Sequence, residues 1–279
     1  MPTRRYEIRT RELHPETVAA LIGDEGLSGC ELAEDLLIAY APEGDADALA
    51  GVDARVRQVC DRFRLTMSTR TLPDENWNAR WEADYPAVEL EGFLRIRAPF
   101  HGREPGYAHE LVIVPEMSFG TGHHATTRLM AGLLRDFSPV GKTCFDFGCG
   151  TGVLGILAAR LGAARVVATD IDARCVESTL ANAARNGVDL AEVREGTESS
   201  LPPGPLDLVL ANINRGVLVA AMPALAERLV PATGELWLSG ILAADLALVD
   251  ARARDAGLAR RERRREGDWL ACRYSPNPL

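Results

Sequence analysis

The stretch Thr143-Cys-Phe-Asp-Phe-Gly-Cys-Gly-Thr-Gly152 is the strongest structural signal in this chain. Its first half is an apolar run typical of a buried strand, and residues 153–161 continue with helical spacing. Glycine lets a backbone turn tightly and approach a ligand closely. A strand, a glycine-rich turn and a helix in this order predict a Rossmann-like α/β sheet with a ligand at its carboxyl edge.

Two carboxylates indicate what that edge binds. Asp146 stands two residues before the first glycine, where it would repel a pyrophosphate and attract a cation. Asp170 ends the next predicted strand, at the position where a carboxylate accepts hydrogen bonds from ribose hydroxyls. Its alternative role is a helix N-cap, for which Asp172 is better placed. The pattern favours S-adenosylmethionine, whose sulfonium is cationic, over NAD, which the Gly150-x-Gly152-x-x-Gly155 spacing also fits.

The surrounding chain alternates between strand and helix patterns from Leu90 onward. This rhythm predicts a parallel sheet covered by helices on both faces, ending in a strand at 269–274 that could be antiparallel. The other expected strands are 93–96, 111–114, 143–147, 165–170, 206–211 and 234–240, and the expected helices are 126–137, 153–161 and 173–186.

The first 73 residues predict a separate, small α+β domain. Their β-α-β-α-β order suggests a ferredoxin-like sandwich. The expected strands are 6–10, 35–41 and 65–71, and the expected helices are 15–22 and 45–63. Residues 74–86 carry Trp77 and Trp81 at helical spacing and are interpreted as a linker helix, so the main domain is expected to span 87–279.

Composition limits the class of protein. With 31 basic and 40 acidic residues in 279, the net charge is −9. This charge disfavours nonspecific binding to nucleic acid or to an anionic membrane. It suits a basic partner, the alternative being that it serves only to keep the protein soluble. Six scattered cysteines without a C-x-x-C pair predict a reduced, cytoplasmic protein. The apolar run 217–226 is short and contains Pro223, so no membrane span is expected. The basic run 260–266 is interpreted as a solvated strand face, with an RNA contact as the alternative.

Asn212 follows the strand predicted at 206–211 and should reach the same sheet edge. Methyl transfer to an amine requires a neutral nitrogen, yet a lysine amine has a pKa of about 10.4. A carboxylate beside the amine would favour its charged form, whereas a neutral amide oxygen can orient it at a smaller penalty. Asn212 therefore fits an amine acceptor, the alternative being an asparagine that only closes a turn.

The segment Met117-Ser-Phe-Gly-Thr-Gly-His-His-Ala-Thr-Thr127 precedes a predicted helix. Thr126 or Thr127 is expected to cap that helix. Phe119 is followed by Gly120, Thr121 and Gly122. The two glycines beside this aromatic residue could form a lid over a ligand. His123 and His124 could act as bases, but adjacent side chains diverge, so no shared metal site is expected.

Four motifs occur together and in order, namely Phe-Gly-Thr-Gly-x-His-x-Thr-Thr at 119–127, Asp-Phe-Gly-Cys-Gly-Thr-Gly at 146–152, Thr-Asp-Ile-Asp at 169–172 and Ala-Asn-Ile at 211–213. With them the chain resembles the bacterial methyltransferases of the eleventh protein of the large ribosomal subunit. The resemblance implies a class I methyltransferase domain and a small substrate-recognition domain, and the protein is expected to be a monomer. It also implies methyl transfer from S-adenosylmethionine to the α-amine and lysine ε-amines of that basic ribosomal protein, up to trimethylation.

Carried over by motif, the resemblance implies cofactor contacts at Thr127, Gly148, Asp170 and Asn212, with Asn212 also aligning the amine. The residue analysis adds Asp146, Gly150 and the 119–121 segment (Phe119, Gly120 and Thr121) to the expected cofactor site, and no metal. The chain departs from the commoner family pattern where His123 and Ala125 replace Thr and Pro, and where Asn214 and Arg215 follow Ala-Asn-Ile.

Three rival functions remain open on the sequence. A nucleic-acid amino-methyltransferase would stack a flipped base on an aromatic residue, where this chain has Ile213 and Asn214. A small-molecule N-methyltransferase would use residues 1–73 for another purpose. An NAD-dependent dehydrogenase would bind NAD at the glycine-rich turn.

Overall fold

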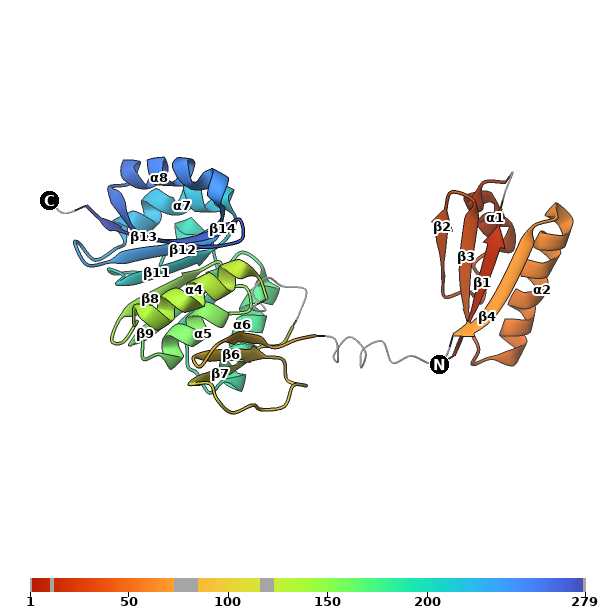
Figure 1. Cartoon of the computed structure of the whole chain (residues 1–279), viewed down its shortest axis with the longest axis horizontal. Coiled ribbons are helices and arrows are strands. Elements are labelled where there is room, and N and C mark those ends of the chain that lie inside the picture. Colours follow the sequence, from red (N-terminus) through yellow and green to blue (C-terminus); the bar gives the residue numbers. More distant parts are fainter. Residues whose placement is uncertain (1, 11–12, 73–84, 116–122, 278–279) are drawn as a thin grey trace. The chain divides into compact units, whose positions relative to one another are not determined.

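The computed structural model describes residues 2–10, 13–72, 85–115 and 123–277 (Figure 1). The chain divides into two compact units, Met1–Tyr85 and Pro86–Leu279. Most of the predicted linker helix, including Trp77 and Trp81, lies outside the described residues.

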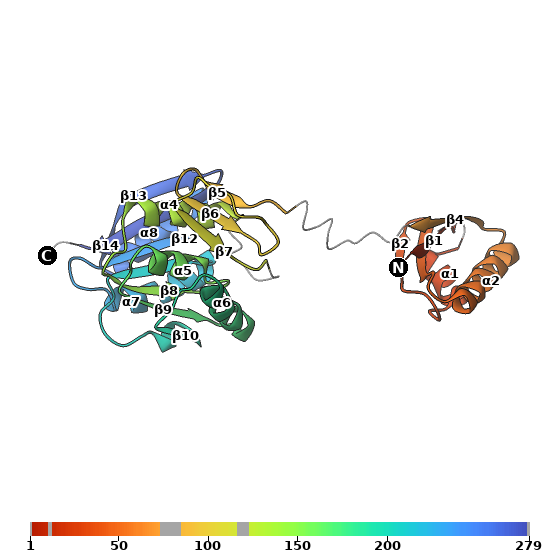
Figure 2. The same ribbon diagram turned by 90° about the horizontal axis from the view of Figure 1, so that it is seen from below.

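The first unit is a four-stranded antiparallel sheet with two helices, in strand order β2-β3-β1-β4. Both helices pack on one face of the sheet (Figure 2), where Tyr6, Ile8, Leu37, Val52 and Val56 are fully or almost fully buried. The elements are β1 (Thr3–Arg9), α1 (Pro15–Ile22), β2 (Gly29–Ala33), β3 (Leu36–Pro42), α2 (Ala46–Phe63) and β4 (Thr66–Leu72).

Strand β2 corrects the predicted element order. The sequence pattern predicted β-α-β-α-β, whereas the structure has β-α-β-β-α-β. All five residues of β2 are exposed, so the strand carries no pattern of buried apolar residues from which it could be recognised. Helix α2 agrees closely with expectation, because Asp45 caps it by accepting hydrogen bonds from the backbone nitrogens of Asp47 and Ala48.

The second unit is built on a seven-stranded sheet in the order β10-β9-β8-β11-β12-β14-β13. The strands from β10 to β12 run parallel, and β14 is antiparallel to both of its neighbours, as the sequence allowed. The strands are β8 (Thr143–Phe147), β9 (Arg165–Asp170), β10 (Glu192–Glu195), β11 (Leu208–Asn212), β12 (Glu235–Leu242), β13 (Leu258–Glu266) and β14 (Trp269–Pro276).

Helices cover both faces of this sheet (Figure 1), with α4, α5 and α6 over one apolar cluster and α7 and α8 over the other. They are α4 (Ala125–Asp136), α5 (Val153–Arg160), α6 (Ala173–Arg185), α7 (Arg215–Glu227) and α8 (Leu246–Asp255), with single 3₁₀ turns η1 (Glu198–Ser200) and η2 (Ala243–Asp245). The predicted α/β class is confirmed. Within the described part of the chain, no helix combines the length and the apolar character needed to cross a membrane.

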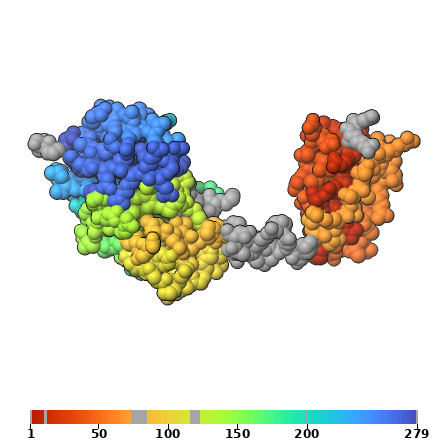
Figure 3. Space-filling view, viewed as in Figure 1, coloured from red at the N-terminus to blue at the C-terminus, as the bar shows by residue number. Residues whose placement is uncertain are grey.

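A small sheet precedes the main one and shares its apolar core. It contains β5 (Val88–Leu90), β6 (Leu94–Arg97) and β7 (His109–Val112) in the order β5-β6-β7. Leu94 and Leu111 are fully buried against the α4–α5 side of the second unit. In the space-filling view the small sheet, in orange and yellow, covers that side of the unit (Figure 3).

Candidate active site

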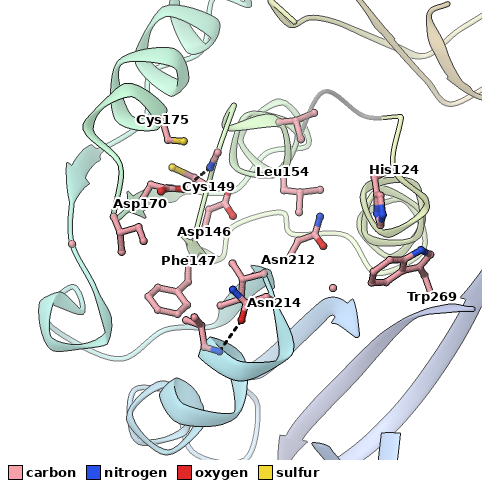
Figure 4. A pocket seen from close by; sticks show the side chains of 18 residues that line it. His124, Asp146, Phe147, Cys149, Leu154, Asp170, Cys175, Asn212, Asn214 and Trp269 are labelled. Atoms are coloured by element: carbon pink, nitrogen blue, oxygen red, sulfur yellow. Dashed lines mark hydrogen bonds between the residues drawn. The ribbon is translucent and has the colours of Figure 1, made fainter. Parts of the chain in front are cut away.

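A cavity of about 450 Å³ lies at the carboxyl ends of the parallel strands. Its wall includes the turn after β8, the end of β9, the turn after β11 and the start of β14 (Figure 4). In open α/β sheets the ligand binds at this edge, so the cavity lies where the fold predicts a site.

The turn after β8 can be made only with glycine. Gly148 has φ +75°, and a Cβ there would lie 2.2 Å from Cγ2 of Ile213. Gly152 has φ +78°, and a Cβ there would lie 2.7 Å from Cγ2 of Thr179. Any side chain at these two positions would collide with its neighbours. Glycine has none, so the backbone of this turn can lie close to the cavity without obstructing it.

Asp170 holds this turn from the end of β9. Its carboxylate accepts hydrogen bonds from the backbone nitrogen of Gly150 at 2.9 Å and from that of Asp172 at 3.1 Å. Asp172 itself caps α6 by accepting from the backbone nitrogen of Arg174, as predicted. Asp170 is therefore not the N-cap, and its carboxylate lines the cavity.

Asp146 lines the cavity from beneath the turn and is only 2% exposed. It accepts a hydrogen bond of 2.8 Å from the backbone nitrogen of Gly155. Burial and, to a smaller extent, the nearby Asp170 charge raise the pKa of Asp146 to about 7, against the lowering effect of the Gly155 hydrogen bond. The carboxyl is thus only partly ionised near neutral pH, so it offers a cation less charge than the sequence suggested.

Asn212 is the last residue of β11 and is 9% exposed. Its Nδ2 donates a long hydrogen bond of 3.5 Å to Oγ1 of Thr127 in α4. The residue lines the cavity, and its buried Oδ1 accepts no hydrogen bond within the described residues. The turn-closing role belongs instead to Asn214, which caps α7 through the backbone nitrogen of Val217. A buried amide oxygen without a partner is costly, which indicates a ligand that donates to it.

Thr127 is fully buried and supports Asn212 from behind, but it does not belong to the cavity wall. The helix that carries it begins at Ala125 and is capped by His124, so the expected cap at Thr126 or Thr127 is wrong. The imidazole ring of His124 accepts the capping hydrogen bond. A threonine was expected in this role because hydroxyl groups are commoner helix caps. Phe119, Gly120 and Thr121 lie outside the described residues.

The two adjacent histidines diverge, as expected. His123 Nε2 lies 2.8 Å from the carbonyl oxygen of Pro86, whereas His124 lines the cavity. His124 packs edge-to-face on Trp269, with ring centroids 4.6 Å apart. Burial, aided by the charge of Arg128, lowers the pKa of His124, so its ring is neutral at pH 7.

Sequence reasoning missed several residues of the cavity wall. Trp269 starts the last strand, more than 50 residues after Asn212, and no local pattern connects the two. Ile171 follows Asp170 and is 73% exposed, which is unusual for a large apolar residue and indicates a contact surface. Gly240 has φ +82°, and a Cβ there would lie 2.0 Å from the carbonyl oxygen of Ile213, so it allows the turn after β11 to close.

These residues fit S-adenosylmethionine. The Asp170 carboxylate can accept from ribose hydroxyls, and Ile171 offers an apolar surface beside it. Asp146, partly ionised near pH 7, supplies some negative charge for a cation, and Asn212, whose Oδ1 accepts no hydrogen bond within the described residues, also lines the cavity. The fold and the site together define a class I S-adenosylmethionine-dependent methyltransferase.

Comparison with known proteins identifies the family. The sequence model of ribosomal protein L11 methyltransferase (PrmA) matches residues 20–276. A ribosomal protein L11 methyltransferase of Porphyromonas gingivalis is 38% identical over 278 residues, covering 99% of this chain and 95% of that protein. One from Bacteroides thetaiotaomicron is 32% identical over 262 residues, covering 93% of each.

A solved structure is similar as well. The crystal structure of a ribosomal protein L11 methylase from Lactobacillus delbrueckii subsp. bulgaricus aligns with a TM-score of 0.65 and 26% identity, covering 70% of this chain and all of that one. The chain belongs to the ribosomal protein L11 methyltransferase family. The resemblance drawn from the four motifs is thereby confirmed.

Proposed function

We propose that this enzyme methylates the lysine ε-amines and the N-terminal α-amine of ribosomal protein L11, adding up to three methyl groups to each. The carrying observation is Asn212, which lines the cavity and whose buried Oδ1 accepts no hydrogen bond within the described part of the chain. An incoming amine has N–H groups to donate to it. The relatives named above support L11 as the substrate.

The chemistry of the site suits an amine. When bound, S-adenosylmethionine would supply a methyl group on a cationic sulfur; the new N–C bond forms as the C–S bond breaks, and the sulfur keeps the electron pair. After each of the first two transfers the nitrogen loses a proton to water, and after the third it stays a quaternary ammonium. Asn212 orients the nitrogen through its amide oxygen, and this neutral group does not hold the amine in its charged form. The apolar wall of the cavity further favours the neutral amine by excluding water.

We infer the positions of the cofactor's parts from the same wall. Asp170 accepts from the ribose hydroxyls, and the exposed Ile171 packs against the base. Gly148 and Gly150 bring the backbone close to the bound molecule, and Asp146 faces its cationic part. The 119–121 segment remains a predicted contact, as does Thr127.

We further propose that the first unit recognises the substrate. Residues 1–73 carry nine arginines and thirteen acidic side chains, so this unit is acidic and complements a basic ribosomal protein. We place the reaction in the cytoplasm, where ribosomal proteins are made, and expect the enzyme to act as a monomer.

The test is methyl transfer from labelled S-adenosylmethionine to purified L11 and, in parallel, to ribosomal RNA. We expect label in L11 alone, located by mass spectrometry on lysine and N-terminal amines. Label in RNA alone would favour a nucleic-acid amino-methyltransferase. A thermal shift with NAD but none with S-adenosylhomocysteine would contradict the cofactor assignment.

A second experiment tests the recognition unit. Removal of residues 1–85 should abolish methylation of L11, while binding of S-adenosylhomocysteine, measured by calorimetry, shows that the remaining unit is folded. An unchanged rate of L11 methylation would show that the first unit serves another purpose.

A further inference from the structure

The cavity has two chemically different ends. Asp170 and Cys175 lie at one end, His124 and Trp269 lie at the other, and Asn212 lies between them (Figure 4). If Asp170 holds the ribose, the transferred methyl group lies near Asn212. The aromatic pair of His124 and Trp269 then faces the acceptor nitrogen.

Both members of this pair are held in place by the fold. Nδ1 of His124 accepts the capping hydrogen bond from the backbone nitrogen of Thr126 at 3.4 Å, and this bond fixes the ring. Trp269 is paired in the sheet on both sides, with Leu242 of β12 and Glu266 of β13. The two rings meet edge-to-face, with an interplanar angle of 70°. The acceptor end therefore presents a wall of two aromatic rings in contact, one carried by the start of a helix and the other by a strand paired on both sides.

The three methyl transfers to one nitrogen make different demands on the site. A neutral primary amine has two N–H groups and a monomethylamine has one, so both can donate to Oδ1 of Asn212. A neutral dimethylamine has none, so Asn212 cannot orient it by a hydrogen bond. Its nitrogen becomes positive as the N–C bond forms, as in the earlier transfers, but this charge is permanent because no proton can be lost, and it is spread over the methyl groups.

We propose that Trp269, braced by His124, is the residue that determines whether the third methyl group is added. The face of an aromatic ring attracts a quaternary ammonium group without any hydrogen bond. The wall therefore stabilises the developing trimethylammonium where Asn212 no longer can. This inference rests on the proposed function, because it assumes an amine acceptor.

The surrounding charges agree with this role. His124 is neutral at pH 7, so it does not repel a cation. The nearest basic side chain on the same helix, Arg128, is paired with Glu266 through Nε at 2.9 Å and also through Nη2. Its positive charge is thus compensated by the Glu266 carboxylate.

The experiment uses the full-length enzyme with L11 and measures the distribution of mono-, di- and trimethylated products by mass spectrometry over time. In Trp269→Leu we expect the third transfer to slow by about 3- to 30-fold relative to the first transfer of the same variant. Trp269→Phe keeps an aromatic face and should restore most trimethylation. Asn212→Ala should show the opposite pattern, with the first transfer slowed most.

Control measurements separate this role from a structural one. S-adenosylhomocysteine affinity and melting temperature should be similar in wild type, Trp269→Phe and Trp269→Leu. A product distribution in Trp269→Leu equal to that of wild type would overturn the inference, as would a wild-type enzyme that stops at dimethylation. Neither result would affect methylation of L11 itself, whereas a wild type that leaves L11 unlabelled would overturn the proposed function first.

A binding measurement on the wild type avoids any folding defect. The full chain with S-adenosylhomocysteine is titrated with an L11 peptide containing trimethyllysine, and with the same peptide containing the neutral isostere in which carbon replaces the charged nitrogen. We expect the cation to bind about 3- to 30-fold more tightly. Equal affinities would show that the wall contributes only apolar contact and would overturn the inference.

Discussion

The side-chain nitrogen of Asn212 lies 3.5 Å from the hydroxyl oxygen of Thr127, so a residue in the first turn of α4 holds the amide at the end of β11. This contact engages the amide nitrogen and leaves the amide oxygen without a partner within the described residues. It also gives Thr127, which lies behind the cavity wall, a way to influence the reaction.

Loss of the Thr127 hydroxyl should therefore slow catalysis. In Thr127→Val we expect kcat to fall by about 2- to 10-fold, because one hydrogen bond to a neutral group contributes about 0.5–1.5 kcal/mol. Thr127→Ser retains the hydroxyl and serves as the control. Calorimetry with S-adenosylhomocysteine separately tests the direct contact between Thr127 and the cofactor that the family resemblance implies. A kcat of Thr127→Val equal to that of wild type would contradict the positioning role.

Substitution of Asp170 should weaken cofactor binding. Asp170→Ala removes the acceptor for the ribose hydroxyls and for the backbone nitrogen of Gly150, so we expect affinity for S-adenosylhomocysteine to fall by about 10- to 100-fold. Asp172→Ala is the matched control, because Asp172 caps α6 and does not line the cavity. That variant should lose about 1 kcal/mol of stability while keeping its affinity. Equal affinities of the two variants would exclude the ribose role.

The pH dependence of stability should report on Asp146. Its pKa is raised by burial from an ordinary value near 4 to about 7, so the native state retains a proton that the unfolded chain has lost. The contribution of Asp146 to the free energy of unfolding should therefore be most favourable below about pH 4. It should fall as the pH rises and level off above pH 7.

Asp146→Asn should remove that slope, because the amide cannot ionise but can still accept from the Gly155 nitrogen. The variant should gain stability over wild type from pH 4 to 7, reaching a few kcal/mol at pH 8. Denaturant unfolding at several pH values measures the difference. A difference that stays constant with pH would contradict the raised pKa.

Gly240 should be far less tolerant of a side chain than Gly257. Both have positive φ, but a Cβ at Gly240 would lie 2.0 Å from the carbonyl oxygen of Ile213, whereas a Cβ at Gly257 would meet nothing within 4 Å. Gly257→Ala should cost about 1 kcal/mol from backbone strain alone. Gly240→Ala should cost several times more and displace the turn that follows Asn212. Similar melting temperatures for the two variants would contradict this.

Local sequence patterns were sufficient for the elements that carry the site. The apolar run 143–147 and the run 165–170 form β8 and β9 with the predicted bounds, because buried parallel strands consist almost entirely of apolar residues. The glycines after β8 and the aspartate that ends β9 could be assigned to one sheet edge from their places in these patterns. Strands β2 and β10, which lack a fully buried residue, carry no such signal.

The sequence by itself determined the fold class, the glycine-rich turn and the family, since each depends on residues that are close together in the chain. Only the tertiary structure decided that Trp269 meets His124, that Thr127 supports Asn212, and that Asp146 is buried deeply enough for a pKa of about 7. Those properties depend on distances between segments far apart in the chain and on exclusion of water. They arise only when the sheet and its helices are packed together.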